Sequence, residues 1–368
     1  MDQEQLIYTI GLTIIPGIGH ITAKKLISFC GSAEAVFREK KRNLLRIPGI
    51  GAVLSEYITT QNVLQVAERE LGFIDRFRIG CKYFQDEDYP YRLKQCIDSP
   101  VLLYYKGNAD LNTEKVLSIV GTRSATGYGR AVCEELIRDL ADTGVLIVSG
   151  LAYGIDTCSH KEALAKGLKT IGVLAHGLDR IYPGQNKRLA EKMLRQGGLL
   201  TDFISGTKPD RENFPSRNRI IAGLSDATIV VEAAVSGGAL ITADIANSYN
   251  RDVYAVPGRW NDELSAGCNS LIRTNRAALI QSATDLKFML GWEKDAAAKA
   301  PKQTELFVNL SPDEEVIVRI LRENGVCGID LLVMVSGLGS GKVATALLNL
   351  EMQTIIKGLP GKRYMFNR

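Results

Sequence analysis

The stretch "FPSRNRIIAGLSDATIVVEAA", Phe214 to Ala234, decides how this chain folds. Its first half predicts a helix, because an apolar run follows the arginines at 217 and 219 and Pro215 suits a first helical turn. The segment ATIVVEAA predicts a buried strand, because it is short, continuous and rich in aliphatic residues. A helix N-terminus already carries about half a positive charge, so two arginines near it need a negatively charged partner.

The same alternation of strands and helices extends from Val116 to Ala283. Seven segments predict strands: VLSIVGT, VLIVSGL, TIGVLAHG, GLLTDF, ATIVVEAA, DVYAVPG and AALIQSA. Helical segments such as YGRAVCEELIRDLADTG and ITADIANSYN lie between them. This order predicts a doubly wound α/β fold, in which helices cover both faces of a mainly parallel sheet. We assign the domain to residues 81–292, with CKYF and VLLYYKG as further short strands near its start.

Residues 1–80 predict a separate helical domain that contains a repeat. IPGIGHITAKKLI, Ile15 to Ile27, returns as IPGIGAVLSEYI, Ile47 to Ile58. Each copy resembles a helix-hairpin-helix motif, whose turn glycines expose N–H groups at a helix start that can hold a nucleic-acid phosphate. The alternative is that the two hairpins simply pack on each other, and the sequence leaves both interpretations open.

The C-terminal part predicts a linker and a small third domain. Residues 293–310 are rich in alanine, lysine and proline, which is typical of a linker. Residues 311–368 contain three helical stretches followed by two short strands around Leu359 to Lys362, an order that resembles a winged helix. The predicted recognition helix offers only Lys342, so a protein-docking role is at least as well supported as DNA reading.

Composition excludes several classes of protein. The chain has 368 residues, 45% hydrophobic and 23% charged, with a net charge of +4. It contains no apolar run of about 18 residues and no signal peptide, so we expect a cytoplasmic protein without a membrane span. Its seven cysteines form no CxxC pair and its three histidines lack metal-ligand spacing. We therefore expect reduced thiols and no bound metal.

The loops that follow the predicted strands are the candidate functional region, because ligands bind beyond the carboxyl ends of parallel strands. Most of these loops contain glycine, and backbone N–H groups exposed at helix starts suit anions. The cations that these loops bring to one rim are Arg123, Lys187, Arg188, Lys208, Arg211, Arg217, Arg219 and Arg259. The sequence thus predicts an anion-binding rim.

Enzyme signatures are weak in comparison. GTRSATGYG departs from the GxGxxG dinucleotide motif, and neither a Walker A motif nor GxSxG occurs, so we expect no cofactor. Glu232 is the best candidate for a general base, although pairing with a rim arginine is the favoured interpretation. His176, Asp156 and Asp179 are better explained as residues that anchor loops or cap backbone N–H groups.

Six blocks of sequence resemble the DNA-processing protein A (DprA/Smf) family. They are SIVGTRSATGYG, SGLAYGIDTCSH, HGLDRIYP, FPSRNRIIAGLS, VEAAVSGGALITA, and VPG with SAGCNSLI. The resemblance implies an extended Rossmann-like, mainly parallel core, flanked by a helix-hairpin-helix-like N-terminal domain and a winged-helix-like C-terminal domain. The end domains are weaker matches than the core.

The resemblance also implies a function without catalysis. Members of this family bind single-stranded DNA through the Rossmann-like domain, usually as homodimers, protect incoming DNA, and help load the RecA recombinase during natural transformation. The DNA-binding residues that it implies here are Gly121, Arg123, Ser124, Lys187, Arg211, Phe214, Arg217, Asn218, Arg219, Gly237 and Gly238.

On this interpretation the partner of the arginines is a phosphate backbone, and Phe214 provides a face on which a base stacks. The alternatives are a core role for Phe214 and ion pairs between the arginines and Asp210, Glu212 or Glu232. Two rival functions also stay open. SGGALITAD partly resembles the loop of LOG-like nucleotide phosphoribohydrolases, with Asp244 near the acidic position. The two end domains could instead make the chain a protein-docking scaffold.

Overall fold

The strands predicted between Val116 and Ala283 are all present in the computed structural model, which describes residues 1–60, 62–293 and 310–367. Their bounds are β3 Val116–Val120, β4 Leu146–Ser149, β5 Thr170–Val173, β6 Gly197–Thr201, β7 Ala227–Val230, β8 Asp252–Ala255 and β9 Ala278–Leu279. All seven pair in parallel, in the order β6-β5-β4-β3-β7-β8-β9. The predicted α/β class is therefore confirmed.

Two further strands extend the sheet at one edge. β1, Gly80–Tyr83, pairs antiparallel with β2, Leu102–Gly107, and β2 pairs antiparallel with β6, which makes a sheet of nine strands. The sequence predicts both segments as strands but does not place them in this sheet. The sheet is thus mainly, but not wholly, parallel.

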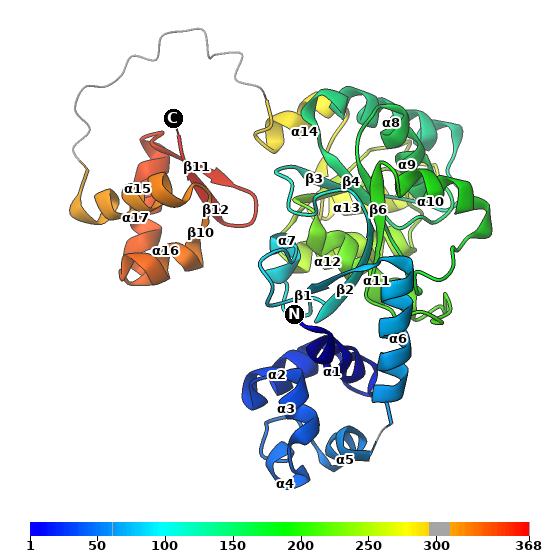
Figure 1. Ribbon diagram of the computed structural model, residues 1–368. Helices are drawn as coiled ribbons and strands as arrows, with labels where there is room; N and C mark the ends of the chain where they lie inside the picture. The colour runs from blue at the N-terminus through cyan, green and yellow to red at the C-terminus, as the bar shows by residue number, and fades with distance from the viewer. Residues whose placement is uncertain (61, 294–309, 368) are drawn as a thin grey trace. The chain divides into compact units, whose positions relative to one another are not determined.

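Helices cover both faces of the sheet (Figure 1). The crossovers from β3 to β6 run through α8 Gly127–Leu140, α9 Ile155–Ala165 and α10 Lys187–Met193. The chain then returns through α11 Asn213–Leu224 to β7, and α12 Gly238–Ser248 leads to β8. Right-handed crossovers put α8, α9 and α10 on one face and α12 on the other, and α12 packs against α11. Because the direction of winding reverses between β3 and β7, their carboxyl ends form the switch point of the sheet.

The core lies between the sheet and these helices. All residues of β3, β4, β5, β6 and β7 are buried, as expected for parallel strands covered on both faces. In α11, every residue from Arg217 to Leu224 is buried, including the polar ones. The helix predicted from the opening stretch is therefore an internal element of the fold.

The N-terminal region is helical, as predicted. Its helices are α1 Gln3–Ile14, α2 His20–Cys30, α3 Ala33–Arg38, α4 Lys41–Leu44, α5 Ala52–Thr60 and α6 Leu64–Phe77. The two PGIG turns precede α2 and α5. Ile10, Ala67 and Ile74 share a buried cluster with Leu102 and Tyr104 of β2. The N-terminal helices thus pack on the sheet edge within one unit, Met1–Gln281, and the predicted domain boundary at residue 80 stays a prediction.

Residues Ser282–Arg368 form a second unit, described here by itself. It contains α14 Ala283–Met289, α15 Pro312–Asn324, β10 Cys327–Gly328, α16 Ile329–Ser336, α17 Ser340–Met352, β11 Ile356–Leu359 and β12 Arg363–Phe366. The three predicted helices and the terminal hairpin are confirmed, and β10 adds a third antiparallel strand to the hairpin. Most of the predicted linker 293–310 lies outside the described residues.

Among the described residues, no single helix is long and apolar enough to cross a bilayer, and the only helices that reach that length and hydropathy do so jointly, as the bent pair α16 and α17.

Candidate functional site

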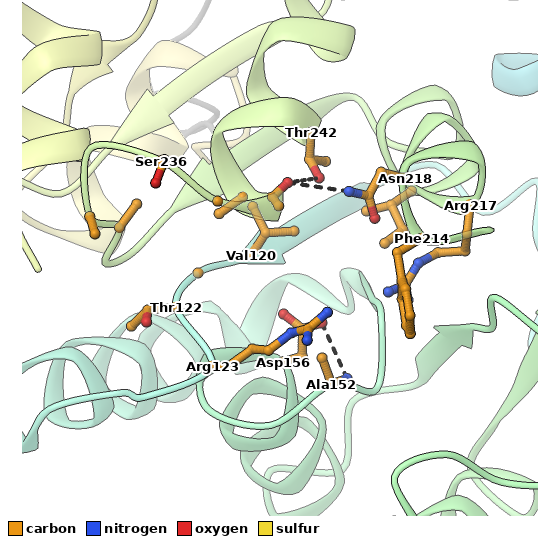
Figure 2. Close-up of a pocket in the computed structure, with 17 residues that line it drawn as sticks. Val120, Thr122, Arg123, Ala152, Asp156, Phe214, Arg217, Asn218, Ser236 and Thr242 are labelled. Carbon is orange, nitrogen blue, oxygen red and sulfur yellow. Dashed lines mark hydrogen bonds between the residues drawn. The ribbon is translucent and has the colours of Figure 1, made fainter. Parts of the chain in front are cut away.

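A cavity of about 270 Å³ lies at the switch point, beyond the carboxyl ends of β3, β4 and β7 (Figure 2). Its walls come from the loop after β3, the β4–α9 loop, the first turns of α11, and the glycine-rich loop that opens α12. Seven residues predicted from the sequence line it: Gly121, Arg123, Phe214, Arg217, Asn218, Gly237 and Gly238. We call this the strand-end cavity.

Four predicted residues lie elsewhere. Ser124, Lys187 and Arg211 are exposed, and their side chains make no ion pair with any residue that the structure describes. Arg219 is buried and points away into a different network. The structure therefore assembles most, but not all, of the predicted set.

Phe214 and Arg123 face each other across this cavity. The Arg123 guanidinium lies over the Phe214 ring, 5.2 Å from its centroid, and Tyr182 approaches the same ring at 6.2 Å between centroids. Phe214 also borders a second cavity of about 60 Å³, which Arg123, Tyr153 and Tyr182 help to line. The ring is half-buried, so it presents surface to both cavities. A cation over an aromatic face is a favourable contact that leaves ring area for another planar group.

Arg217 is a buried cation in the wall between these cavities. It is 4% exposed, and its Nη1 donates hydrogen bonds to the carbonyl oxygens of Gly150 and Val173, each at 2.5 Å. A Cβ atom at position 150 would lie 2.1 Å from that Nη1, so glycine is needed there for the guanidinium to fit. Burial lowers the pKa of Arg217 to about 10, with Asp156 opposing and Arg123 adding to the shift. The side chain therefore stays charged at neutral pH.

The helix that carries Arg217 starts earlier than predicted. α11 begins at Asn213, which makes Pro215 its third residue and Arg217 its fifth. Because the helix dipole acts mainly on the first turn, it imposes little cost on either arginine. Pro215 thus lies in the first turn, as predicted, whereas the arginines lie in the second turn and not at the N-terminus.

Arg219 has a protein carboxylate as its partner. It forms an ion pair with Asp202, directly after β6, and also donates to the carbonyl oxygen of Asp98. Asp202 accepts a second hydrogen bond from His20 Nε2 at 3.1 Å. Burial alone would raise the pKa of Asp202, but Arg219 and His20 outweigh it and hold the pKa below its usual value. The structure thus gives Arg219 an anion other than a phosphate, and other than the expected Asp210, Glu212 or Glu232.

Glu232 accepts hydrogen bonds from the loop after β3 and does not pair with a rim arginine. Its carboxylate accepts from the Thr126 backbone N–H at 2.9 Å and from the Thr126 hydroxyl at 2.6 Å, and it is 1% exposed. The favoured interpretation of Glu232 as an arginine partner is therefore wrong. Its two bonds fix the loop that presents Arg123.

The loop-anchoring roles predicted for three other residues are confirmed. Asp156 accepts from the backbone N–H groups of Gly150 and Ala152, at 3.1 and 3.3 Å. Asp179 accepts from the Gly206 N–H at 3.0 Å, and His176 is buried with hydrogen bonds to Gly177 and Tyr182. Burial raises the pKa of Asp156, against the effect of Arg217. These contacts hold the site loops in fixed positions.

Chemically, the strand-end cavity suits an anion with a planar group attached. It combines a fixed cation, an exposed cation, an aromatic face and glycine loops.

The sequence of residues 81–290 matches the family model described as DNA recombination-mediator protein A. Protein Smf from Synechocystis sp. is 33% identical over 402 aligned positions, which cover 99% of this chain and 99% of that protein. The chain belongs to the DNA recombination-mediator protein A family.

Solved structures agree with this membership. DNA processing protein A from Streptococcus pneumoniae matches with a TM-score of 0.66 and 35% identity, over 78% of this chain and 97% of that one. DNA processing protein A from Helicobacter pylori, in a structure concerned with its single-stranded DNA binding mode, matches with a TM-score of 0.53 and 29% identity, over 59% of this chain and 98% of that one. The predicted family and core fold are confirmed.

Some features of this family member could not be assigned from its sequence. The sequence did not reveal Asp202 as the partner of Arg219, because Asp202 lies 17 residues earlier, directly after a strand. Only the fold of the sheet brings the two side chains together. An acid after a strand, in GLLTDF, is the signal that could have found it. Tyr153 and Tyr182 carry no comparable signal.

The acidic residue of the rival LOG-like interpretation lies outside the strand-end cavity. Asp244 is on α12 and pairs with Arg276 at 2.8 Å. In the part of the chain that the structure describes, no group of three or more His, Cys, Asp or Glu side chains is placed to hold a metal ion.

Proposed function

We propose that this chain binds single-stranded DNA in the strand-end cavity and catalyses no reaction there. The observation that carries the proposal is the pair of cations, Arg123 and Arg217, that shares one small cavity with the ring of Phe214. Arg123 is one of the groups that depress the pKa of Arg217, so the two charges repel each other. A phosphate placed between them would remove that repulsion, because opposite charges at short range favour the ionised forms.

The ring explains why the strand would be single. A base can stack on Phe214 only if it is not already stacked and paired in a duplex, and base–aromatic stacking contributes about 1–3 kcal/mol. The cavity of about 270 Å³ is small for a duplex but adequate for a base or a phosphate with its sugar. The proposed ligand is therefore a single strand with its bases turned toward the protein.

Backbone groups support anion binding on the opposite wall. α12 starts at Gly238 after the exposed glycine Gly237, so its first N–H groups lie beside the cavity that both residues line. A helix N-terminus without side-chain caps is a favourable site for a phosphate. This contact would be independent of base sequence, because it involves only main-chain atoms.

The absence of catalysis is supported by how the candidate acids are used. Both oxygens of Glu232 accept hydrogen bonds from Thr126, and Asp244 pairs with Arg276 away from the cavity. Neither carboxylate is placed to accept a proton from a water or substrate in the cavity. We expect nucleoside monophosphates and DNA to remain intact on incubation with the protein, with no free base released.

The finer parts of the proposal rest on the family. The relatives are named as DNA processing proteins, and the Helicobacter pylori structure concerns single-stranded DNA. We extend this to protection of incoming DNA, assistance to RecA loading, a homodimer formed through the Rossmann-like domain, and a cytoplasmic location. Ser124, Lys187 and Arg211, exposed around the site, are proposed to meet phosphates further along the strand.

A titration with labelled single- and double-stranded oligonucleotides tests the proposal. The wild-type protein should prefer the single strand, with log K falling against log salt by about 0.7 for each phosphate bound. Replacing Arg123 and Arg211 together by Gln should make that slope shallower by about 1.4. A matched variant, Lys94→Gln with Arg273→Gln, removes one Lys and one Arg that are exposed and line neither cavity, and it should bind as the wild type does. Equal binding of both strand forms, or an unchanged slope in the Arg123 and Arg211 variant, contradicts the proposal.

A further inference from the structure

A third cavity, of about 890 Å³, lies between α9 and α10, which pack side by side on one face of the sheet (Figure 1). Four of its lining residues are cations, Lys161, Arg188, Lys192 and Arg195, and none is acidic. It is larger than the strand-end cavity and more open to solvent. We call it the α9–α10 groove.

The four cations of the α9–α10 groove have no charge partner among the described residues. All four side chains are exposed and none forms an ion pair there. Arg188 and Lys192 are four residues apart on α10, so they lie on the same side of that helix. Like charges at this spacing destabilise a helix slightly. Glu191, on the same helix, does not line the groove, so the groove surface carries uncompensated positive charge.

The groove shares one lining residue with the site already described. Tyr153 lines it and also lines the small cavity beside Phe214, and its hydroxyl donates a hydrogen bond to Gln185, another groove residue. Tyr153 is 41% exposed. An aromatic ring therefore stands at the junction, where a base could stack as the backbone passes from one cavity to the next.

We propose that the α9–α10 groove is a second subsite for the same single strand, in which its four cations bind consecutive phosphates. This inference rests on the proposed function of the strand-end cavity. The groove begins beside Tyr153, near the carboxyl end of β4. It ends near Gln196, which directly precedes β6 and so lies at the amino ends of the parallel strands. The bound strand thus leaves the switch point and runs over the helical face of the domain.

The dimensions agree with the number of charges. α9 has 11 residues and is therefore about 16 Å long. Phosphates along one strand of a duplex are spaced by about 3.4 Å along the axis, and an extended single strand spaces them more widely. A groove of this length therefore has room for a few phosphates, which the four cations are sufficient to neutralise. An acidic protein segment would also be attracted by the cations, but the ring of Tyr153, which borders both the groove and the small cavity beside Phe214, favours a nucleic acid.

The decisive test compares two lengths of oligothymidylate on the full chain. An oligomer of about 6 nucleotides should fill the strand-end cavity alone, and one of about 16 should reach the groove as well. Replacing Arg188 and Lys192 by Gln should weaken the long oligomer by about tenfold and reduce its salt slope by about 1.4, with little effect on the short one. Because it removes a like-charge pair, the variant should unfold at the same temperature as the wild type or higher.

The matched control is the variant Lys94→Gln with Arg273→Gln, which carries the same charge change outside the groove. If the groove variant binds the long oligomer as tightly as the wild type does, the groove is not a subsite, while the proposed function stands. Equal losses for both oligomers, or for both variants, would show a general field effect and also overturn the inference. Failure of the wild type to bind either oligomer is the separate outcome that removes the proposed function itself.

Discussion

The strand-end cavity and the α9–α10 groove are both positive, but their cations are held in different ways. In the cavity, Arg217 is 4% exposed and fixed by two backbone carbonyl oxygens. In the groove, Lys161 and Lys192 are exposed on flexible side chains without ion-pair partners among the described residues. A fixed cation selects one geometry of its ligand, whereas exposed lysines bind a phosphate chain in many registers. The comparison predicts that substitution of a buried cation alters stability, that loss of the Phe214 ring alters stacking, and that substitution of the exposed cations, Arg123 included, alters salt dependence.

The largest effect should come from a buried cation beside the cavity. Arg219→Met leaves the Asp202 carboxylate, which is 2% exposed, with His20 as its remaining partner. Breaking a buried ion pair in this way costs about 3–5 kcal/mol of unfolding free energy. Urea denaturation measures the loss. Arg211→Met, an exposed position that precedes the same helix, should change stability by less than about 0.5 kcal/mol. Similar stabilities for the two variants would break the distinction between buried and exposed cations.

Phe214→Ala tests the aromatic part of the cavity. It should weaken single-strand binding by about 1–3 kcal/mol, because a stacking face is lost. The salt slope should stay constant, because stacking releases few counterions. Phe214→Tyr keeps the ring and should retain most of the affinity. A shallower slope in Phe214→Ala would instead mean that the ring mainly positions Arg123, whose guanidinium lies 5.2 Å from its centroid.

A pH series tests the electrostatics behind the cavity. Burial, and secondarily Arg217, lowers the pKa of His160 to about 3, so this histidine is neutral in the folded protein. The unfolded chain takes up the proton below about pH 6.5, so the stability due to neutral His160 is complete above that pH and is lost toward pH 3. The wild-type unfolding free energy should fall by about 1.4 kcal/mol per pH unit between pH 6 and 4 because of this group.

His160→Gln should remove that contribution. His176 also has a pKa lowered mainly by burial, so the informative quantity is the difference between wild type and variant rather than the wild-type slope. Parallel curves for the two proteins between pH 7 and 4 would show that the pKa of His160 is not lowered in the folded protein.

The smallest effect should follow removal of the C-terminal region. Residues 311–368 carry seven Lys or Arg residues against six acids, so they add little net charge. Deletion of residues 293–368 should change single-strand affinity by about threefold or less in a binding titration. A loss of more than about tenfold in a truncated protein that still unfolds cooperatively would show that a third region takes part in binding.

The sequence predicted the sheet well because a strand buried on both faces is recognisable from its own residues. VLSIVGT and ATIVVEAA are short aliphatic runs bounded by polar loops, and both became buried parallel strands. Glycine loops at strand ends likewise indicated where the site lies. The start of α11 was less predictable, because Asn213 carries no strong capping signal and its N-cap residue Glu212 makes no side-chain capping bond.

The sequence could not show which group each polar side chain of α11 contacts. Arg217, Asn218 and Arg219 are neighbours in the chain, yet each meets a different group: backbone carbonyls, the Gly238 carbonyl, and Asp202. Which direction each side chain takes depends on helix phase and on segments that are remote in sequence. A pattern of residue types thus located the cluster but did not separate a ligand-facing arginine from a structural one.

Asp202 also limits how the parts of this chain can be exchanged. Its carboxylate is shared by Arg219 on α11 and His20 on α2, while His20 Nδ1 accepts the N–H of Val101. A chimera that takes residues 1–79 from another family member must therefore bring a hydrogen-bond donor to position 20, or the buried Asp202 carboxylate loses one of the two donors to its Oδ2. The N-terminal helices and the helix that carries Phe214 are, in this sense, a single module for protein engineering, although 199 residues separate His20 from Arg219.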